Sequence, residues 1–176
     1  MTDIAIKSKM SLSKLNVIIA FEDLDKHAIG ININELIEKA CQIAYTEADI
    51  PNIIENSVTP SSVNIVIGDD LLLKDLNNTY RGKNKPTNVL SFPSHELDEN
   101  EDGPFRELGD IIVSYETLQK EAQEQHKPLH DHMAHMIVHG MLHILGYDHD
   151  NEKNALDMES KEVEILEKIN VKNPYI

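Results

Sequence analysis

Three histidines in the last third of the chain have the spacing of metal ligands. The stretch HGMLHILGYDHD, residues 139–150, holds His139, His143 and His149. Residues four apart on an α-helix lie on one face, so His139 and His143 can point their imidazoles at a common ion. Gly146 can take the left-handed conformation that ends a helix, which lets the chain turn back. His149 would then complete a three-histidine set with the fourth position open, as catalytic zinc requires.

Other histidines offer competing ligand sets. His132, His135 and His139 share a helical face, and His135 with His139 is as good a pair by spacing alone. The turn at Gly146 favours the first set, because His149 can reach back by one helical turn only. We expect His132 and His135 to line the site, to hydrogen-bond to the ligand histidines, or to lie at the mouth of the site as polar residues. The remaining histidines are two expected at the surface, His126 and His130, and two without assignment, His27 and His95.

The helix that must carry these ligands is expected from Pro128 to Leu145. It is apolar nearly all round, which is typical of a buried helix. An unpaired imidazole buried there costs about 1–3 kcal/mol, and one shared metal ion would satisfy all three rings together. The composition of this helix therefore favours a metal site over a set of separate core histidines.

The other elements predict an α+β or mixed α/β layer of about four strands with helices packed on it. The helix after the first strand should begin with a capping box formed by Asn32 and Glu35. Asp69 or Asp70 should cap the next helix, which Gly82 ends. We expect strands at 15–23, 61–70, 88–93 and 108–115, a loop at 95–107, and further helices at 32–48, 71–80, 114–125 and 151–170.

The length and composition fit one soluble domain. The chain has 176 residues, of which 1–14 read as a loose tail and 15–176 as a single folded unit. The single cysteine, Cys41, falls on the buried face of helix 32–48 and is expected to be core filler. No signal peptide is recognisable, and no apolar run approaches the ~20 residues that span a bilayer. We expect a cytoplasmic protein without a membrane partner.

The charge is strongly acidic, except in one segment. A formal net charge of −15 argues against nucleic acid, which is bound through Lys and Arg contacts. Segment 74–93 has a local charge of +3, four basic residues against one acid, and could dock a phosphate. The alternative is an ordinary solvated loop. The residues concerned are Lys74, Arg81, Lys83 and Lys85 against Asp75.

The histidine motif resembles two families. It is similar to the zinc-peptidase signature H-E-x-x-H-x-x-G-x-x-H, but Gly140 replaces the glutamate that serves there as general base. That replacement argues against peptide hydrolysis by the usual route. HGMLHILGYDH resembles, without departure, the hallmark H-G-x-L-H-x-x-G-Y-D-H of the YbeY family of bacterial rRNA maturation factors and single-strand-specific endoribonucleases. LNNTYRGKNKPTNVLSFP at 76–93 and LGDII at 108–112 are also similar to that family.

The resemblance, which covers about residues 62–149, implies a function. It implies an α+β fold and one zinc ion on His139, His143 and His149. It implies cleavage of single-stranded ribosomal RNA in 16S rRNA 3′-end maturation and ribosome quality control. The implied partners are rRNA and the ribosome or small-subunit proteins, without DNA. The family's important arginine falls on Arg81.

The chemistry that these residues could perform is phosphodiester cleavage. Zinc on three neutral imidazoles can lower the pKa of a bound water to about 7 and polarise a phosphoryl oxygen. Arg81 could grip the phosphate with its planar fork, unless it is tied in a salt bridge. Asp148 could orient a ligand or take a proton, although a hydrogen bond to the turn's backbone is simpler. Lys83 and Lys85 would attract the RNA backbone.

Three further expectations remain. Tyr80 and Phe92 could stack on bases, but we expect both to pack in the core. A first alternative function is a metal-dependent hydrolase of another substrate, such as a peptide. A second is a non-enzymatic ribosome assembly factor with a structural zinc, although such sites normally close the fourth position with a protein ligand.

Overall fold

A computed structural model describes residues 15–22, 24, 32–51, 54, 59–94 and 104–176. The predicted tail at 1–14, His27, His95 and most of the predicted loop at 95–107 lie outside these ranges. Within them, no helix combines the length and the hydropathy that crossing a membrane would take.

Four strands form one mixed sheet with the order β1-β2-β4-β3. The first three in that order run parallel, and β3 pairs antiparallel with β4 at the edge. β2 and β4 are buried along most of both faces, as expected for central strands rich in Val and Ile. The predicted α+β fold with about four strands is therefore confirmed. The strands are β1 (Asn16–Phe21), β2 (Ser61–Gly68), β3 (Val89–Pro93) and β4 (Arg106–Ser114).

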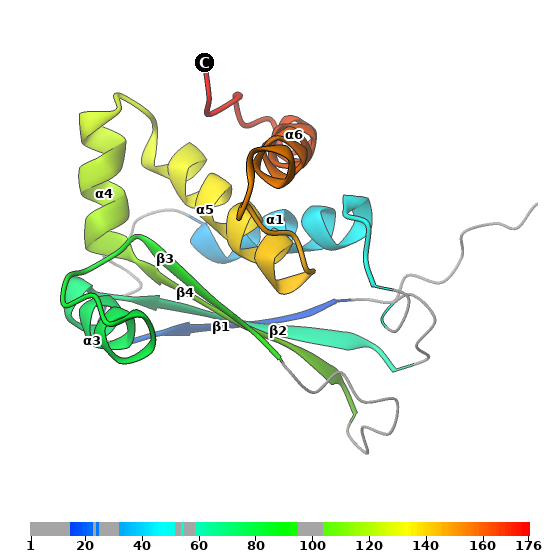
Figure 1. Cartoon of the computed structure of the whole chain (residues 1–176), viewed down its shortest axis with the longest axis horizontal. Coiled ribbons are helices and arrows are strands. Elements are labelled where there is room, and N and C mark those ends of the chain that lie inside the picture. The colour runs from blue at the N-terminus through cyan, green and yellow to red at the C-terminus, as the bar shows by residue number, and fades with distance from the viewer. Residues whose placement is uncertain (1–14, 23, 25–31, 52–53, 55–58, 95–103) are drawn as a thin grey trace, which may run out of the picture.

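Of the five helices in the described part of the chain, α3 lies on one face of this sheet and α1 and α5 lie on the other, where α6 packs on α1 and α5 (Figure 1). Alternate residues of β4 show the division: Ile111 and Val113 join the large core with α1, α5 and α6, whereas Ile112 packs with Leu73 of α3. The site-bearing face is thus the one opposite α3. The helices are α1 (Ile33–Glu47), α3 (Asp70–Arg81), α4 (Tyr115–Glu124), α5 (Leu129–Ile144) and α6 (Glu152–Lys168).

Side-chain caps start three of the helices. The side chains of Asp69, Ser114 and Asn151 each accept a hydrogen bond from a backbone N–H of the first turn of α3, α4 and α6. The predicted capping box of α1 is wrong. Asn32 does precede the helix, but its amide donates to the Glu35 carboxylate and caps no backbone N–H. Its ψ of 62° departs from the extended geometry in which a side chain reaches those groups.

The last strand begins earlier than its sequence pattern indicates. We predicted residues 108–115, but β4 starts at Arg106 because Ser61 and Ser62 of β2 pair with Arg106 and Glu107. At the other end, Tyr115 is the first residue of α4, since Ser114 is its cap. Strand pairing set the first boundary, and the helix cap set the second.

Helix α5 is the buried central helix that the sequence predicted. Its apolar side chains contact the sheet, α1 and α6, and Met133, Ile137, Met141 and Leu142 are fully enclosed. Cys41 of α1 lies in the same core, and burial raises the pKa of its thiol. The prediction that this cysteine is core filler is confirmed.

Gly140 allows α5 to lie close to β3 and β4. A Cβ atom at this position would come within 2.8 Å of Ile111 Cγ2 and 3.1 Å of Ser91 Oγ. A glutamate here would have to displace Ile111, which is completely buried. The glycine of the histidine motif is therefore required by helix-to-sheet packing.

We expect Gly140→Ala to lower the free energy of unfolding by about 1–2 kcal/mol. The overpacking cost of roughly 1–3 kcal/mol exceeds the helix-propensity gain of up to about 1 kcal/mol. Urea denaturation followed by circular dichroism would measure the change as a lower midpoint at an unchanged slope. Unfolding free energy equal to that of the parent would show that the contact with Ile111 relaxes freely.

Candidate metal centre

The end of α5 returns the chain so that a third histidine reaches the first two. Gly146 has a φ of +98°, a left-handed conformation that suits glycine. The N–H of Tyr147 donates to the carbonyl oxygen of Leu142 at 2.9 Å, and this bond closes the turn. His149 follows directly, and its ring lies 5.7 Å from that of His139 and 5.0 Å from that of His143, centroid to centroid. The predicted stop and return of the chain are confirmed.

The three predicted histidines converge. One ring nitrogen from each of His139, His143 and His149 lies within 4.8 Å of the others. The Nε2 atoms of His139 and His143 are 3.1 Å apart. A tetrahedral zinc ion with Zn–N bonds of about 2.0–2.1 Å would place two ligand nitrogens about 3.3 Å apart. The spacing therefore suits a zinc ion.

The opposite ring nitrogens fix which atoms face the site. His139 Nδ1 lies 2.6 Å from Glu162 Oε1, and His143 Nδ1 lies 3.0 Å from the carbonyl oxygen of Tyr147. A carboxylate and a carbonyl can only accept, so both Nδ1 atoms must carry the proton. With both rings neutral, the two Nε2 lone pairs then face each other, and a positive charge shared between them, a proton or a metal ion, would stabilise the pair.

The protonation state of His143 also suits metal binding. Burial lowers the pKa of His143 to about 4, and the neighbouring His139 and His149 act in the same direction. The imidazole is therefore neutral near pH 7, which is the state that binds a metal. These donors fit a zinc ion with three protein ligands.

Glu162 of α6 is the site residue that the sequence patterns did not reveal. Its side chain is 1% exposed and accepts hydrogen bonds from His135, His139 and Tyr175. Burial acts to raise the pKa of Glu162, but these three hydrogen bonds prevail and lower it to about 2. A signal was present: this carboxylate interrupts the apolar face of α6, four residues after the buried Met158.

We expect Glu162→Gln to weaken zinc binding by about 10–100-fold, the usual effect of removing a group that orients a metal ligand. The amide can accept from one histidine but would oppose the other with its N–H groups. Competition with a chromophoric chelator would measure the dissociation constant. Glu164→Gln, two residues along α6 and paired with Lys161 at the surface, is the matched control. Equal affinities for the two variants would contradict the role of Glu162.

The competing ligand sets do not assemble. His135 donates to Glu162, and His132 is buried and bonded to Glu121 at 2.7 Å. Within the described ranges, the three histidines of the motif form the one cluster suited to a metal. The two histidines predicted at the surface lie there: His126 is exposed, and His130 is half-exposed beside Asp131.

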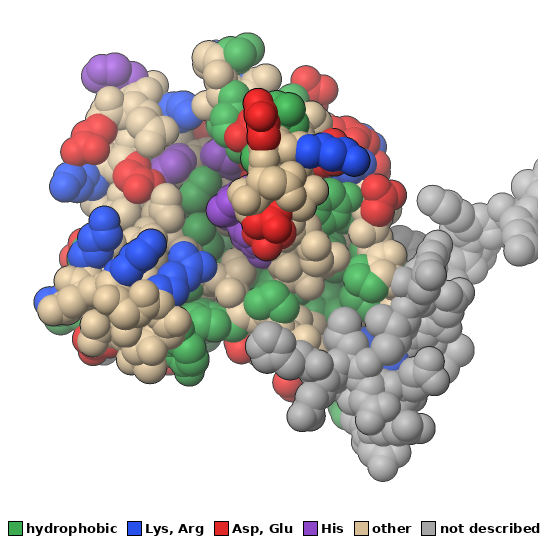
Figure 2. Space-filling view, in the orientation of Figure 1, with side chains coloured by type: hydrophobic (Ala, Val, Ile, Leu, Met, Phe, Trp, Pro, Cys, Tyr) green, Lys and Arg blue, Asp and Glu red, His purple; other side chains and the backbone are tan. Residues whose placement is uncertain are grey.

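A pocket of about 820 Å³ opens over the three histidines and reaches the basic segment. Arg81, the last residue of α3, and Lys83 line this metal pocket together with the imidazoles. Figure 2 shows Lys and Arg side chains gathered beside the histidines. The buried Asn77 holds the basic turn, since its amide donates to the carbonyl oxygen of Lys85 at 2.8 Å.

Asp148 and Arg81 both line the metal pocket, but their side chains are engaged differently. Oδ1 of Asp148 accepts the N–H of His149 at 2.7 Å, so this residue makes the backbone hydrogen bond that was its simpler expected role. None of the ion pairs between described residues involves Arg81, so the alternative of a salt bridge finds no partner there.

The prediction that Tyr80 packs in the core is wrong. The side chain is 65% exposed, and its ring lies 4.8 Å from that of Phe92, centroid to centroid. Phe92 is partly buried against the small cluster under α3. Tyr80 lies in the last turn of α3, beyond the buried Leu73 and Asn77, where the Phe92 ring packs against it.

Comparisons with known proteins identify the family of this chain. The family model described as endoribonuclease YbeY matches residues 19–170. The endoribonuclease YbeY of Bartonella bacilliformis is 45% identical over 82% of this chain and 97% of its own length. That of Rhizobium etli is 47% identical over 66% of this chain and 67% of its own. The solution structure of TM1509 from Thermotoga maritima has a similar fold, with a TM-score of 0.52 and 23% identity over 88% of this chain and 91% of that one. The chain therefore belongs to the YbeY family, whose named members are endoribonucleases.

Proposed function

We propose that this protein is a zinc-dependent endoribonuclease that cuts single-stranded RNA. We further propose that its substrate is ribosomal RNA and that it acts in 16S rRNA 3′-end maturation and ribosome quality control. We also propose that it works in the cytoplasm, with the ribosome or small-subunit proteins as partners. The metal ligands are His139, His143 and His149, and Arg81 is the catalytic residue that binds the phosphate.

One observation carries the proposal: three histidine nitrogens and two basic side chains line the same pocket. The histidines provide a site for a cation, and Arg81 with Lys83 provides further positive charge. A phosphodiester needs both, because negative charge increases on the phosphoryl oxygens in the transition state. The acidic remainder of the surface would restrict RNA to this pocket.

When bound, zinc supplies a Lewis acid that makes a coordinated water more acidic and polarises a phosphoryl oxygen. The protein's own groups prepare the site for it. Glu162 keeps a proton on Nδ1 of His139, and the carbonyl of Tyr147 keeps one on Nδ1 of His143, so that both Nε2 atoms present lone pairs. The Arg81 guanidinium can donate two parallel hydrogen bonds to phosphate oxygens.

Gly140 separates this site from a zinc peptidase. The peptidase motif uses a glutamate at that position as general base, and here the position packs against Ile111 and Ser91. The chain must therefore rely on the metal and on Arg81 for charge stabilisation. That combination suits a phosphate ester better than a peptide bond.

The test compares zinc-loaded protein with chelator-treated protein on a fluorescein-labelled single-stranded RNA. We expect cleavage by the loaded protein, loss of cleavage after chelation, and recovery when zinc is restored. Duplex RNA, single-stranded DNA and casein are the control substrates, and all three should stay intact. A precursor of 16S rRNA with an extended 3′ end should be shortened.

Three results would overturn the proposal. Cleavage of RNA that persists after chelation would remove the metal from the reaction. Cleavage of casein would make the protein a peptidase. Stoichiometric zinc together with intact RNA would favour a non-enzymatic assembly factor.

A further inference from the structure

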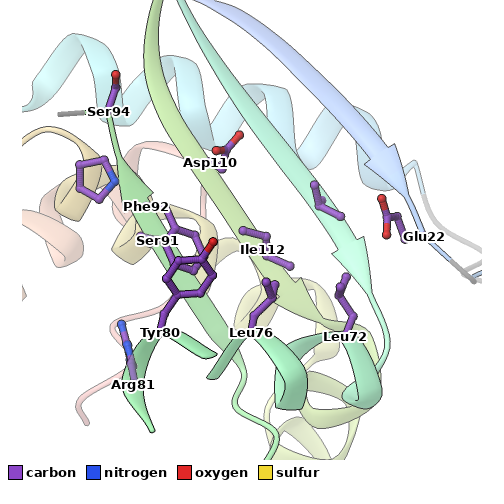
Figure 3. Close-up of a pocket in the computed structure, with 12 residues that line it drawn as sticks. Glu22, Leu72, Leu76, Tyr80, Arg81, Ser91, Phe92, Ser94, Asp110 and Ile112 are labelled. Carbon is purple, nitrogen blue, oxygen red and sulfur yellow. The ribbon is translucent and has the colours of Figure 1, made fainter. Parts of the chain in front are cut away.

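A second groove of about 820 Å³ lies on the α3 side of the sheet (Figure 3). Its floor is apolar, formed by Val66 of β2 and Ile112 of β4, and Leu72 and Leu76 of α3 form a wall. The volume falls in the range of sites that hold a small organic ligand.

The groove joins the metal pocket around the edge strand β3. Ser91, Pro93 and Arg81 line both spaces. Other residues of β3 line only one of the two spaces: Val89 lines the metal pocket but not the groove, and Phe92 lines the groove but not the metal pocket. A flexible chain that crosses β3 at Arg81 would therefore contact both.

An aromatic surface stands at this crossing. Tyr80 is largely exposed, and its ring packs against that of Phe92 with an angle of 60° between the two ring planes. Figure 3 shows the Tyr80 ring between Arg81 and the apolar side chains of the groove. An exposed aromatic ring beside a cation is the combination that proteins use to bind single-stranded nucleic acid, because every base has a face that can stack.

Charged residues at the two ends of the groove differ in sign. Arg81 lies at the end next to the metal pocket, and Glu22 lies at the other end (Figure 3). Asp110 also lines the groove, where its carboxylate accepts from Asn64 at 2.8 Å. A phosphate is attracted to the Arg81 end and repelled from the acidic part, whereas an uncharged base can occupy the apolar middle.

We propose that this groove is a nucleobase subsite: one base of the RNA strand stacks on Tyr80 while the adjoining phosphate lies at Arg81 and enters the metal pocket. This inference rests on the proposed ribonuclease function and names how that function would select unpaired RNA. A base in a duplex is stacked and paired, so it cannot turn into the groove.

The test uses the zinc-loaded full chain and an eight-nucleotide single-stranded RNA. Tyr80→Ala should lower kcat/KM by roughly five- to a hundredfold, the range of one lost base–aromatic stack, mainly through KM. Tyr80→Phe keeps the ring and should stay within about twofold of the parent. Leu71→Ala, which removes a similarly exposed apolar side chain from α3 outside the groove, is the matched control and should behave as the parent does.

A set of RNAs with one abasic nucleotide each identifies the stacked base. For the parent, an abasic nucleotide at one position should lower kcat/KM as much as the Tyr80→Ala substitution does. For the Tyr80→Ala variant, the same abasic RNA should lower kcat/KM no further. Equal KM values for Tyr80→Ala and the parent, or uniform cleavage of all abasic RNAs, would overturn the subsite and leave the ribonuclease proposal standing. A Tyr80→Ala variant altered in sedimentation but not in KM would make the groove a protein contact instead. If the parent cuts no RNA, the ribonuclease proposal itself fails.

Discussion

The His143→Ala variant is expected to lose stoichiometric zinc and at least about 10³-fold in RNA cleavage, because the metal's several kcal/mol of transition-state stabilisation would be lost with it. His143 is central to the cluster. Its Nε2 atom lies 3.1 Å from that of His139, and its ring lies 5.0 Å from that of His149. With two ligands remaining, and one of them exposed, zinc would no longer be held tightly.

The measurement pairs metal analysis of the purified variant with cleavage of a labelled single-stranded RNA. His130→Ala is the matched control, because this residue belongs to the same helix but contacts Asp131 at the surface. Circular dichroism should show both variants folded. A His143→Ala protein that keeps one zinc per chain and cuts RNA normally would refute the proposed ligand set.

The Arg81→Ala variant should keep its zinc and lose about 10²–10³-fold in kcat, the typical cost of removing one positioned charge-stabilising donor. Arg81 lines the metal pocket with the histidines, and its side chain is not consumed by any ion pair between described residues. Arg81→Lys keeps the charge without the planar fork and should recover only part of the rate.

The Lys85→Ala variant tests whether the position of the Arg81 guanidinium matters or only the positive charge of the turn. This lysine belongs to the same basic turn and carries the same charge, but it is exposed and does not line the pocket. We expect a small decrease that disappears at high salt, because a distant exposed charge is screened. Equal losses for Lys85→Ala and Arg81→Ala would mean that only the net charge of the turn matters.

Local signals in the sequence predicted the helices and the convergence of the histidines. Asp69, one of the two residues predicted to cap helix 71–80, does cap α3, since a cap depends mainly on neighbours along the chain. Gly146 ended α5 as expected because its conformation is also a local property. The ligand geometry followed from the helical spacing and this turn, which is why it could be stated before the fold was known.

Features that depend on contacts between distant segments could not be predicted in this way. The start of β4 at Arg106 results from pairing with β2, and the exposure of Tyr80 depends on where α3 ends relative to β3. The histidine that Glu162 orients is far from it in sequence: His139 is 23 residues away, and only the packing of α6 against α5 brings them together. The spacing of one motif does not contain that information.

Tyr175 connects the segment after α6 to the carboxylate that holds His139. Its hydroxyl donates to Glu162, and the Pro174 carbonyl beside it accepts from the Lys127 ammonium at 2.7 Å. Proteolytic loss of Tyr175 would thus remove a hydrogen bond to the carboxylate that orients His139, while the helical core stays intact. Such clipped material would give a normal far-ultraviolet spectrum but low zinc occupancy, and an intact-mass measurement before metal titration would separate this preparative artefact from weak intrinsic affinity.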